Sequence, residues 1–516
     1  MTTVHGRGLA KRTAKNSLFS AFEFIVALVL TFAITPVLVH HLGTERYGIL
    51  ALASTFMGFM ALLDIGAAPA LIRFLSYHTA RTEREETETI LGAGLVFYAL
   101  VGSLGFLLSL VLAGPILPHL FRLGQVQLSE ARIAFVISGV GFLFTMLTIP
   151  FRCVPVALQR FDLVALLNTA ILTASACATL GLVVAGFGLI AVVAATASAA
   201  AATTGTYFGL AKRLSPSMRF RPVFELKIMK SILSFSSLVF LVQISSAVLL
   251  QLDRIVLGAV ASVSLVSYYV VPGLLAQRLQ MVTVKVTVVL FPAATDLVAR
   301  GDIARVVTLY RRATGMLAVG LLSVVTPLIV GAPELLHFWL GGDFAEKSGN
   351  ILRILIVTSF VTAMTTVAYY TALAFARPGV PAVFYGVGAV GNVGLMIALI
   401  PPFGLMGAAV AYLASAIPLL GLVWFAETRL LSLTGRHWLA LVRRTAPMIA
   451  LEAVLAAVAM HLSTNLFEAI LGIGVPAAAG LLLYFAVLAD EADRRTLDAF
   501  LPVRFVRGER RRATDA

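Results

Sequence analysis

The sequence is poor in charged residues. Asp, Glu, Lys and Arg make up only 12% of its 516 residues, whereas soluble globular proteins carry about 25%. Hydrophobic residues make up 59%, and the mean hydropathy is +0.97. This shortage of charge excludes a soluble globular domain, and we expect an all-α polytopic membrane protein.

Cysteine is almost absent. Both cysteines, Cys153 and Cys177, lie inside apolar segments, which excludes a disulfide framework and a structural zinc site. The eight histidines fall at termini, loops or predicted span edges, so we expect no histidine acid or base within the membrane. They are His5, His40, His41, His78, His119, His337, His437 and His461.

The sequence also lacks a nucleotide-binding motif. No G-x-x-x-x-G-K-[ST] occurs, which excludes a P-loop pump. The loops opposite the termini are too short for a soluble catalytic domain. A membrane enzyme such as an acyltransferase would need a polar catalytic cluster, and the sequence offers none, so we expect no enzyme. An H⁺ or Na⁺ gradient, or consumption of the product, would then drive any transport, with no other cofactor.

Long apolar runs are what the chain does contain. A window of about 20 residues predicts fourteen membrane spans, the first of them uncleaved. The N-terminal spans are 17–39, 47–76, 89–113, 131–157, 163–185 and 188–211. The later spans are 231–258, 265–295, 309–332, 350–375, 380–400, 404–426, 441–463 and 467–489.

The net charge of +14 is distributed unevenly between the two sides of the membrane. The side with both termini collects 31 of the 39 Lys and Arg residues, the opposite side five, and three lie within spans. Short cytoplasmic loops retain positive charge, so we place both termini in the cytoplasm. The basic tail RFVRGERRRATDA would then lie near anionic membrane lipids, and nucleic acid is not an expected partner.

A repeat with an offset near 216 residues divides the chain. AGFGLIAVVAATASA at 185–199 recurs as PPFGLMGAAVAYLAS at 401–415, SLFS at 17–20 as SILS at 231–234, and ERYGILAL more weakly as LVSYYVVP. Six spans separate the copies, so the halves would face the same way. We predict a lobe over 1–222, a second over 223–430, and a trailing helix pair with a basic tail over 431–516. Two such lobes are typical of transporters.

Several segments resemble the polysaccharide-exporter or O-antigen-type flippases of the multidrug/oligosaccharidyl-lipid/polysaccharide exporter superfamily. They are HLGTERYGILALASTFMGFMALLDIGAAPALIRFLS, LQLDRIVLGAVASVSLVSYYVVPGLL, APELLHFWLGGDFAEKSGNILRIL and FGLMGAAVAYLAS. The resemblance covers nearly the whole chain through the order and spacing of loose motifs. It implies alternating-access transport of undecaprenyl-diphosphate-linked oligosaccharide from the cytoplasmic to the periplasmic leaflet of a bacterial inner membrane.

Two cations lie inside LLAQRLQMVTVKVTVVLFP, with no acidic residue beside them. Each costs roughly 2.5 to 3.5 kcal/mol in lipid. Arg278 and Lys285 are seven residues apart, nearly two helical turns, so they project from almost one face, with Gln277 nearby. We predict that they bind the substrate diphosphate, Arg278 through its planar fork. Snorkelling to the interface is the alternative for Lys285.

Acidic residues within spans are candidates for a gate. Asp64 and Arg73 lie in LLDIGAAPALIRF, and the repeat sets Asp64 opposite Lys285. The two could pair across the lobes as an inner gate; the alternative is a local pair of Asp64 with Arg73 or a loop cation.

Two alternative roles are open for each of the other charged residues within spans. Asp253 and Arg254, near the end of span seven, fit a structural ion pair or an interfacial position, although Asp253 also matches the family pattern. Glu23 in span one is a candidate H⁺ or Na⁺ site, or a satisfied carboxylate near the interface.

The alternative transport functions belong to the same superfamily. A peptidoglycan lipid II flippase would look similar, whereas a multidrug exporter of cations would be expected to have an acidic cavity. A scaffold role within a polysaccharide polymerase complex would not depend on Arg278.

Overall fold

The structure, a computed structural model, describes residues 2–64, 67–81, 83–121, 123–225, 237–287 and 290–489. Over these ranges the chain is helical, without a β-strand. Ten segments in them are long and apolar enough to cross a membrane. Two of the ten, Ile25–Asp64 and Gly379–Leu430, each include two predicted spans. The all-α membrane architecture predicted from composition is therefore confirmed.

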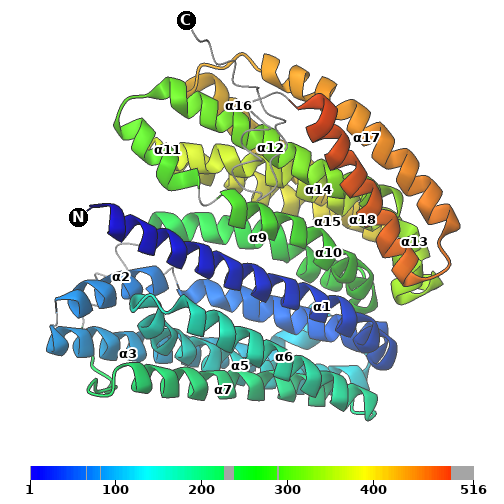
Figure 1. The fold of residues 1–516 in the computed structure, drawn as a ribbon. Helices are drawn as coiled ribbons and strands as arrows, with labels where there is room; N and C mark the ends of the chain where they lie inside the picture. Colours follow the sequence, from blue (N-terminus) through cyan, green and yellow to red (C-terminus); the bar gives the residue numbers. More distant parts are fainter. Residues whose placement is uncertain are drawn as a thin grey trace, which may run out of the picture. The chain divides into compact units, whose positions relative to one another are not determined.

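The chain divides into two compact units (Figure 1). The first comprises Met1–Val270 and Met396–Leu405. Its helices are α1 (Thr2–Met60), η1 (Ala61–Asp64), α2 (Ala67–Ala80), α3 (Arg84–Val111), η2 (Leu112–Ile116), α4 (Leu117–Leu120), α5 (Gln125–Ala157), α6 (Phe161–Val184), α7 (Leu189–Leu214) and α9 (Ser237–Val260), followed by the start of α10 (Val263–Thr287).

Small residues let the helices of the first unit approach closely. α5 packs against α3 and α7, and α1 packs against α6 and α9. Gly102 and Gly105 of α3 face Leu143 and Phe142 of α5 so closely that a Cβ at either glycine would overlap those side chains. Contacts of this kind replace the hydrophobic effect, which is weak between helices in lipid.

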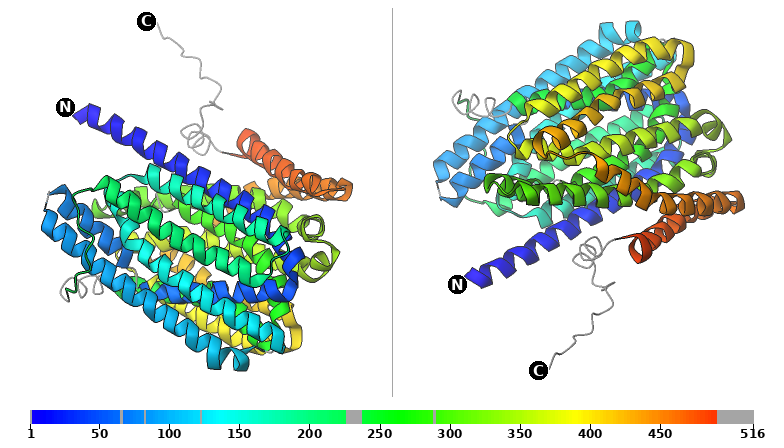
Figure 2. Two further views of the ribbon diagram at one scale, coloured as in Figure 1. Left: turned by 90° about the horizontal axis from the view of Figure 1, so that it is seen from below. Right: turned by 90° about the horizontal axis from the view of Figure 1, so that it is seen from above.

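The second unit comprises Val271–Leu395 and Met406–Ala516. Besides the rest of α10, it contains α11 (Leu290–Ala299), α12 (Ile303–Val330), α13 (Ala332–Leu340), α14 (Gly342–Ala374), most of α15 (Gly379–Ser415), α16 (Ile417–Phe425), η3 (Ala426–Leu430), α17 (Arg436–Leu462), α18 (Leu466–Leu483) and η4 (Tyr484–Leu488). Within this unit α12 lies against α14, α17 and α18. The pair α17 and α18, coloured orange to red, lies side by side in both views of Figure 2.

Two glycines interrupt long helices. Gly43 in α1 has φ 76° and ψ 164°, and Gly404 in α15 has φ 53° and ψ −129°. Both values lie in a region that residues with a Cβ avoid. Gly43 separates predicted spans one and two. Gly404 lies in the second copy of the repeated FGL turn, and α7 begins directly after Gly188 of the first copy. Both copies therefore form helix junctions, as predicted.

Predicted span two, expected as one helix, contains a described interruption. Its α-helical part α1 ends at Met60 and is followed by the 3₁₀ turn η1 and then by α2. The described residues of predicted span eight belong to α10 and α11. Pro69 and Pro292 are the third residues of α2 and α11, where a missing N–H leaves no hydrogen bond unmade.

Some predicted features lie outside the described residues. They are the SILS copy at 231–234, the end of the basic loop at 226–230, and the basic tail. The lobe boundaries at 222/223 and 430/431, and the cytoplasmic position of the termini, stay predictions.

Candidate functional site

The face of α10 that carries Arg278 is not the face that packs against α14. Ala276, Leu279, Thr283 and Thr287 are buried at intervals of three and four residues, which defines one side of a helix. On that side the Gln280 Nε2 donates a hydrogen bond of 2.7 Å to Thr362 Oγ1 of α14. At 100° per residue, Arg278 lies on the opposite side.

The surroundings of Arg278 are apolar and partly open. Its Nη1 lies 3.7 Å from the Met281 Sδ, and Met281 is 51% exposed. Gln277 lies a quarter turn away with intermediate exposure. Lys285 belongs to the same helix, two turns further along, but its side chain lies outside the described residues. Arg278 therefore lies on the side of α10 away from the Gln280–Thr362 contact, and the pairing of Arg278 and Lys285 in one column stays a prediction.

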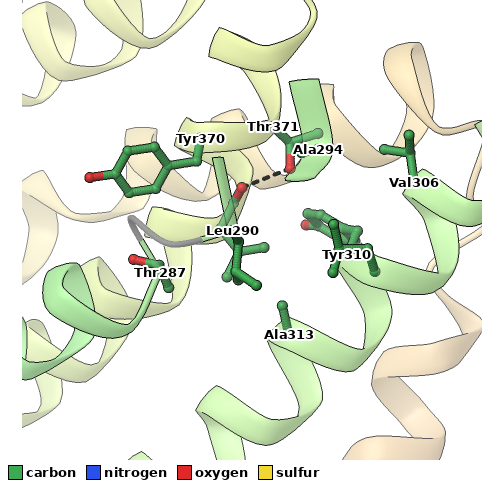
Figure 3. A pocket seen from close by; sticks show the side chains of 10 residues that line it. Thr287, Leu290, Ala294, Val306, Tyr310, Ala313, Tyr370 and Thr371 are labelled. Atoms are coloured by element: carbon green, nitrogen blue, oxygen red, sulfur yellow. Dashed lines mark hydrogen bonds between the residues drawn. The ribbon is translucent and has the colours of Figure 1, made fainter. Parts of the chain in front are cut away.

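A small cavity lies where α10 is followed by α11. Its volume of 20 Å³ is enough for about one water molecule. Thr287 of α10, Leu290 of α11, Tyr310 of α12 and Thr371 of α14 line it (Figure 3). Because the Thr371 hydroxyl already donates 2.8 Å to the Val367 carbonyl, it can offer a lone pair to such a water.

Asp64 ends η1, between the two helices that form predicted span two. The Tyr98 hydroxyl of α3 donates a 2.5 Å hydrogen bond to the Asp64 Oδ1. Tyr98 is buried and Asp64 is partly buried. Arg73, two turns into α2, is exposed. The pairings of Asp64 with Lys285 or with Arg73 stay predictions.

Glu23 belongs to a polar chain across three helices. The Asn168 Nδ2 of α6 donates a 3.1 Å hydrogen bond to the Glu23 Oε1 of α1. The Tyr207 hydroxyl of α7 donates a 2.7 Å bond to the Asn168 Oδ1. Sequence reasoning named Glu23 but missed both partners, although an Asn within an apolar span was a usable signal.

Asp253 and Arg254 differ in burial. Asp253 is 5% exposed, and the Arg254 backbone N–H donates a 2.8 Å hydrogen bond to its Oδ1. Arg254 is only partly buried, and its charge lies near Tyr47 of α1. Arg254 therefore lies close to α1, and the choice between a structural and a functional role for the two residues stays open.

A second buried carboxylate, Glu427 of η3, was missed. Its Oε1 accepts hydrogen bonds from the Tyr310 hydroxyl at 3.1 Å and the Trp438 Nε1 at 2.8 Å, and the His437 Nε2 lies 3.2 Å away. The network joins η3, α12 and the start of α17. Tyr310 lies 117 positions before Glu427 in the sequence, and His437 and Trp438 lie 10 and 11 positions after it. No local sequence pattern links residues at these spacings.

The described residues contain no group of three or more His, Cys, Asp or Glu side chains that could hold a metal ion. The polar groups described above are instead arginines and carboxylates that lie between apolar helices, several of the carboxylates with hydrogen bonds. The family model for polysaccharide biosynthesis proteins matches residues 13–298, more than half of the chain. The chain belongs to this family.

Two further likenesses agree with the family. A "Putative O-antigen transporter" of Shigella flexneri is 21% identical over 406 residues, which cover 77% of this chain and 93% of the relative. The membrane protein EpsK of Bacillus subtilis (strain 168), whose function is uncharacterized, is 26% identical over 137 residues, 27% of each chain. The resemblance inferred from the sequence is confirmed.

Solved structures show the fold. The lipid II flippase MurJ, in an inward closed conformation, superposes with a TM-score of 0.72 at 13% identity, covering 94% of this chain and all of MurJ. An inward-facing multidrug transporter of the MATE family, from the MOP superfamily, gives a TM-score of 0.61 at 17% identity over 79% of this chain and 98% of its own. This family member therefore has the fold of MurJ and MATE transporters.

Proposed function

We propose that this protein is an alternating-access flippase. It moves undecaprenyl-diphosphate-linked oligosaccharide from the cytoplasmic to the periplasmic leaflet of the inner membrane, for O-antigen, capsule or exopolysaccharide synthesis. The observation that carries the proposal is the family match over residues 13–298, which the Shigella relative extends to most of the chain. A polysaccharide polymerase complex is a proposed partner that takes the translocated product.

Arg278 is the proposed diphosphate ligand. It lies on the side of α10 away from α14, beside partly exposed Met281, where a bulky substrate headgroup could reach it. A guanidinium can donate two parallel hydrogen bonds to phosphate oxygens. Lys285, on the same helix face, adds a compact point charge, and Gln277 adds hydrogen bonds to sugar or phosphate.

Movement between the two access states is proposed to centre on predicted span two. The 3₁₀ turn η1, which interrupts its α-helical parts, provides a place where backbone angles can change. Pairing of Asp64 with Lys285 would close the inner side and part when it opens. Glu23, held by Asn168, is the proposed site for a coupling H⁺ or Na⁺, since an intramembrane carboxylate can take up either.

The deciding experiment measures which leaflet holds the substrate. Cells lacking the protein should accumulate lipid-linked oligosaccharide on the cytoplasmic leaflet. In complemented cells we expect Arg278→Ala to slow translocation about 10- to 100-fold, because a charge-assisted hydrogen bond contributes about 1.5 to 3 kcal/mol. Arg278→Lys should translocate substrate at an intermediate rate, because lysine keeps the positive charge but lacks the planar guanidinium group.

The matched control is Arg300→Ala. Arg300 follows α11, is exposed, and forms an ion pair with nearby Asp296, so its removal should leave the rate unchanged. A wild-type rate for Arg278→Ala, at equal protein level, would remove Arg278 from the substrate pathway. Oligosaccharide that stays evenly distributed in the deletion strain would contradict the flippase proposal itself.

A lipid II flippase is the second candidate, favoured by the likeness to MurJ over 94% of the chain. Both substrates carry a lipid diphosphate, so Arg278 would serve either. The two are separated by depleting the protein. Loss of surface polysaccharide with normal peptidoglycan supports oligosaccharide export, whereas lysis with lipid II accumulation supports the second candidate.

A further inference from the structure

A basic pocket opens between α12 and α17 of the second unit. Its volume is 260 Å³. Arg311, Arg312 and Gly315 of α12, His437 and Arg444 of α17, and Tyr484 of η4 are among its lining residues. No Asp or Glu belongs to the described residues that line it. Three arginines from two helices therefore line one cavity, and none of its described lining residues is acidic.

The walls of this pocket are fixed by other contacts. His437 reaches the buried Glu427, which also holds Trp438 and Tyr310. α12 additionally packs along both α17 and α18 (Figure 1). This network holds the start of α17 against α12. The two helices that form the walls of the pocket are therefore fixed relative to each other.

The three arginines lie about equally far along their helices. Arg311 and Arg312 are eight and nine residues from the start of α12, and Arg444 is eight residues from the start of α17. At 1.5 Å per residue all three are about 12 to 14 Å along their helices. These helices are each about 40 Å long, comparable with a whole bilayer including its headgroups. Long arginine side chains at this depth reach back to the headgroup region.

Apolar side chains beside the pocket face outward. Leu439 and Val442 of α17, which alternate with the lining residues, are 66% and 59% exposed. In a membrane protein such residues contact acyl chains. The site therefore offers arginines for an anionic group and, next to them, an apolar surface for hydrocarbon.

We propose that this pocket binds the phosphate headgroup of an anionic glycerophospholipid of the surrounding bilayer. Basic pockets between membrane helices are suited to such headgroups, and arginine forks match phosphate oxygens. The bound lipid joins α12 to α17, and so ties the trailing helix pair to the rest of the unit. The site is separate from α10 and does not depend on the identity of the transported substrate.

The test uses purified full-length protein in detergent, with the melting temperature as readout. Phosphatidylglycerol and phosphatidylcholine of identical acyl chains are added in separate titrations. We expect phosphatidylglycerol to raise the melting temperature in a saturable manner and phosphatidylcholine to have no comparable effect. Equal effects of the two lipids would overturn the proposal.

Two variants locate the effect. Gly315→Leu fills the pocket but leaves every charge, and a Cβ at Gly315 meets nothing within 4 Å, so the backbone can accept it. We expect at least tenfold weaker phosphatidylglycerol binding. Gly320→Leu, on the same helix, also meets open space and does not line the pocket, and should bind like the wild type. Arg311→Gln combined with Arg444→Gln provides the second route if Gly315→Leu does not fold.

The source of the phosphate is decided by added anions. Inorganic phosphate or diphosphate at millimolar concentration should reproduce little of the stabilisation, because neither supplies an acyl chain. If they reproduce it fully, the pocket is a free-phosphate site and the lipid proposal is wrong. Undiminished phosphatidylglycerol binding by Gly315→Leu and by the double arginine variant would also overturn it.

Discussion

Polar side chains inside this protein are accommodated by specific neighbours on other helices. Glu427 has two hydrogen-bond donors and a nearby histidine, and Glu23 has Asn168. Glu452 of α17 is accommodated differently, since it is fully buried against Gly480 of α18. The absence of a side chain at Gly480 is what gives the carboxylate room.

This arrangement makes Gly480→Ala a test of packing at a single residue. A Cβ at position 480 would overlap the Glu452 carboxylate, and overpacking typically costs about 1 to 3 kcal/mol. We expect a lower melting temperature for the purified protein. Gly474→Ala in the same helix meets nothing within 4 Å and should be neutral or slightly stabilising. Adding Glu452→Ala should relieve the overlap, so additive losses in the double variant would refute the contact.

At the scale of helices, glycine and proline occur where helices are interrupted or begin. Gly43 turns the chain between the two predicted spans that α1 contains. Proline in the first turn opens α2 and α11, just after Asp64 and Thr287. The two prolines belong to predicted spans two and eight, which occupy corresponding positions in the two halves.

Gly43→Ala tests the first of these junctions. At φ 76° and ψ 164° an alanine incurs backbone strain of about 1 to 3 kcal/mol, although its Cβ would meet nothing within 4 Å. The variant should lose its monodisperse chromatographic peak at a lower temperature than the wild type. Gly181→Ala, a helical position in α6 with equally open space, should not. Equal behaviour of the two variants would mean that the junction adapts without strain.

At the scale of the whole molecule, charge distribution sets orientation. The predicted cytoplasmic side carries 31 of 39 cations, and this bias determines topology during insertion. The same assignment would place the start of α17, and with it the basic pocket, at the cytoplasmic face.

Reporter insertions give the measurement. Alkaline phosphatase, active only in the periplasm, should be inactive when inserted after residue 434 and active after residue 464, on opposite ends of α17. Green fluorescent protein should give the reverse pattern. Phosphatase activity at 434 alone would invert the orientation and place the basic pocket in the periplasmic leaflet.

The amino-acid sequence by itself determined the membrane class, the spans and the family. Lipid offers no hydrogen bonds, so each spanning segment must pair its backbone N–H and C=O groups within its own helix. Each span can therefore be recognised from its own sequence as a long apolar run. Loose motifs such as LLDIGAAPALIRF, spaced along the whole chain, carried the family resemblance for the same local reason.

Only the tertiary structure decided which polar groups meet. Asn168 and Glu23 are 145 positions apart, and Tyr310 and Glu427 are 117 apart, so no local period links them. The pocket of Arg311, Arg312 and Arg444 likewise exists only because α12 packs on α17. Membrane helices associate where their surfaces fit closely, often at small residues. Whether two helix surfaces fit depends on the tertiary structure and cannot be read from either helix alone.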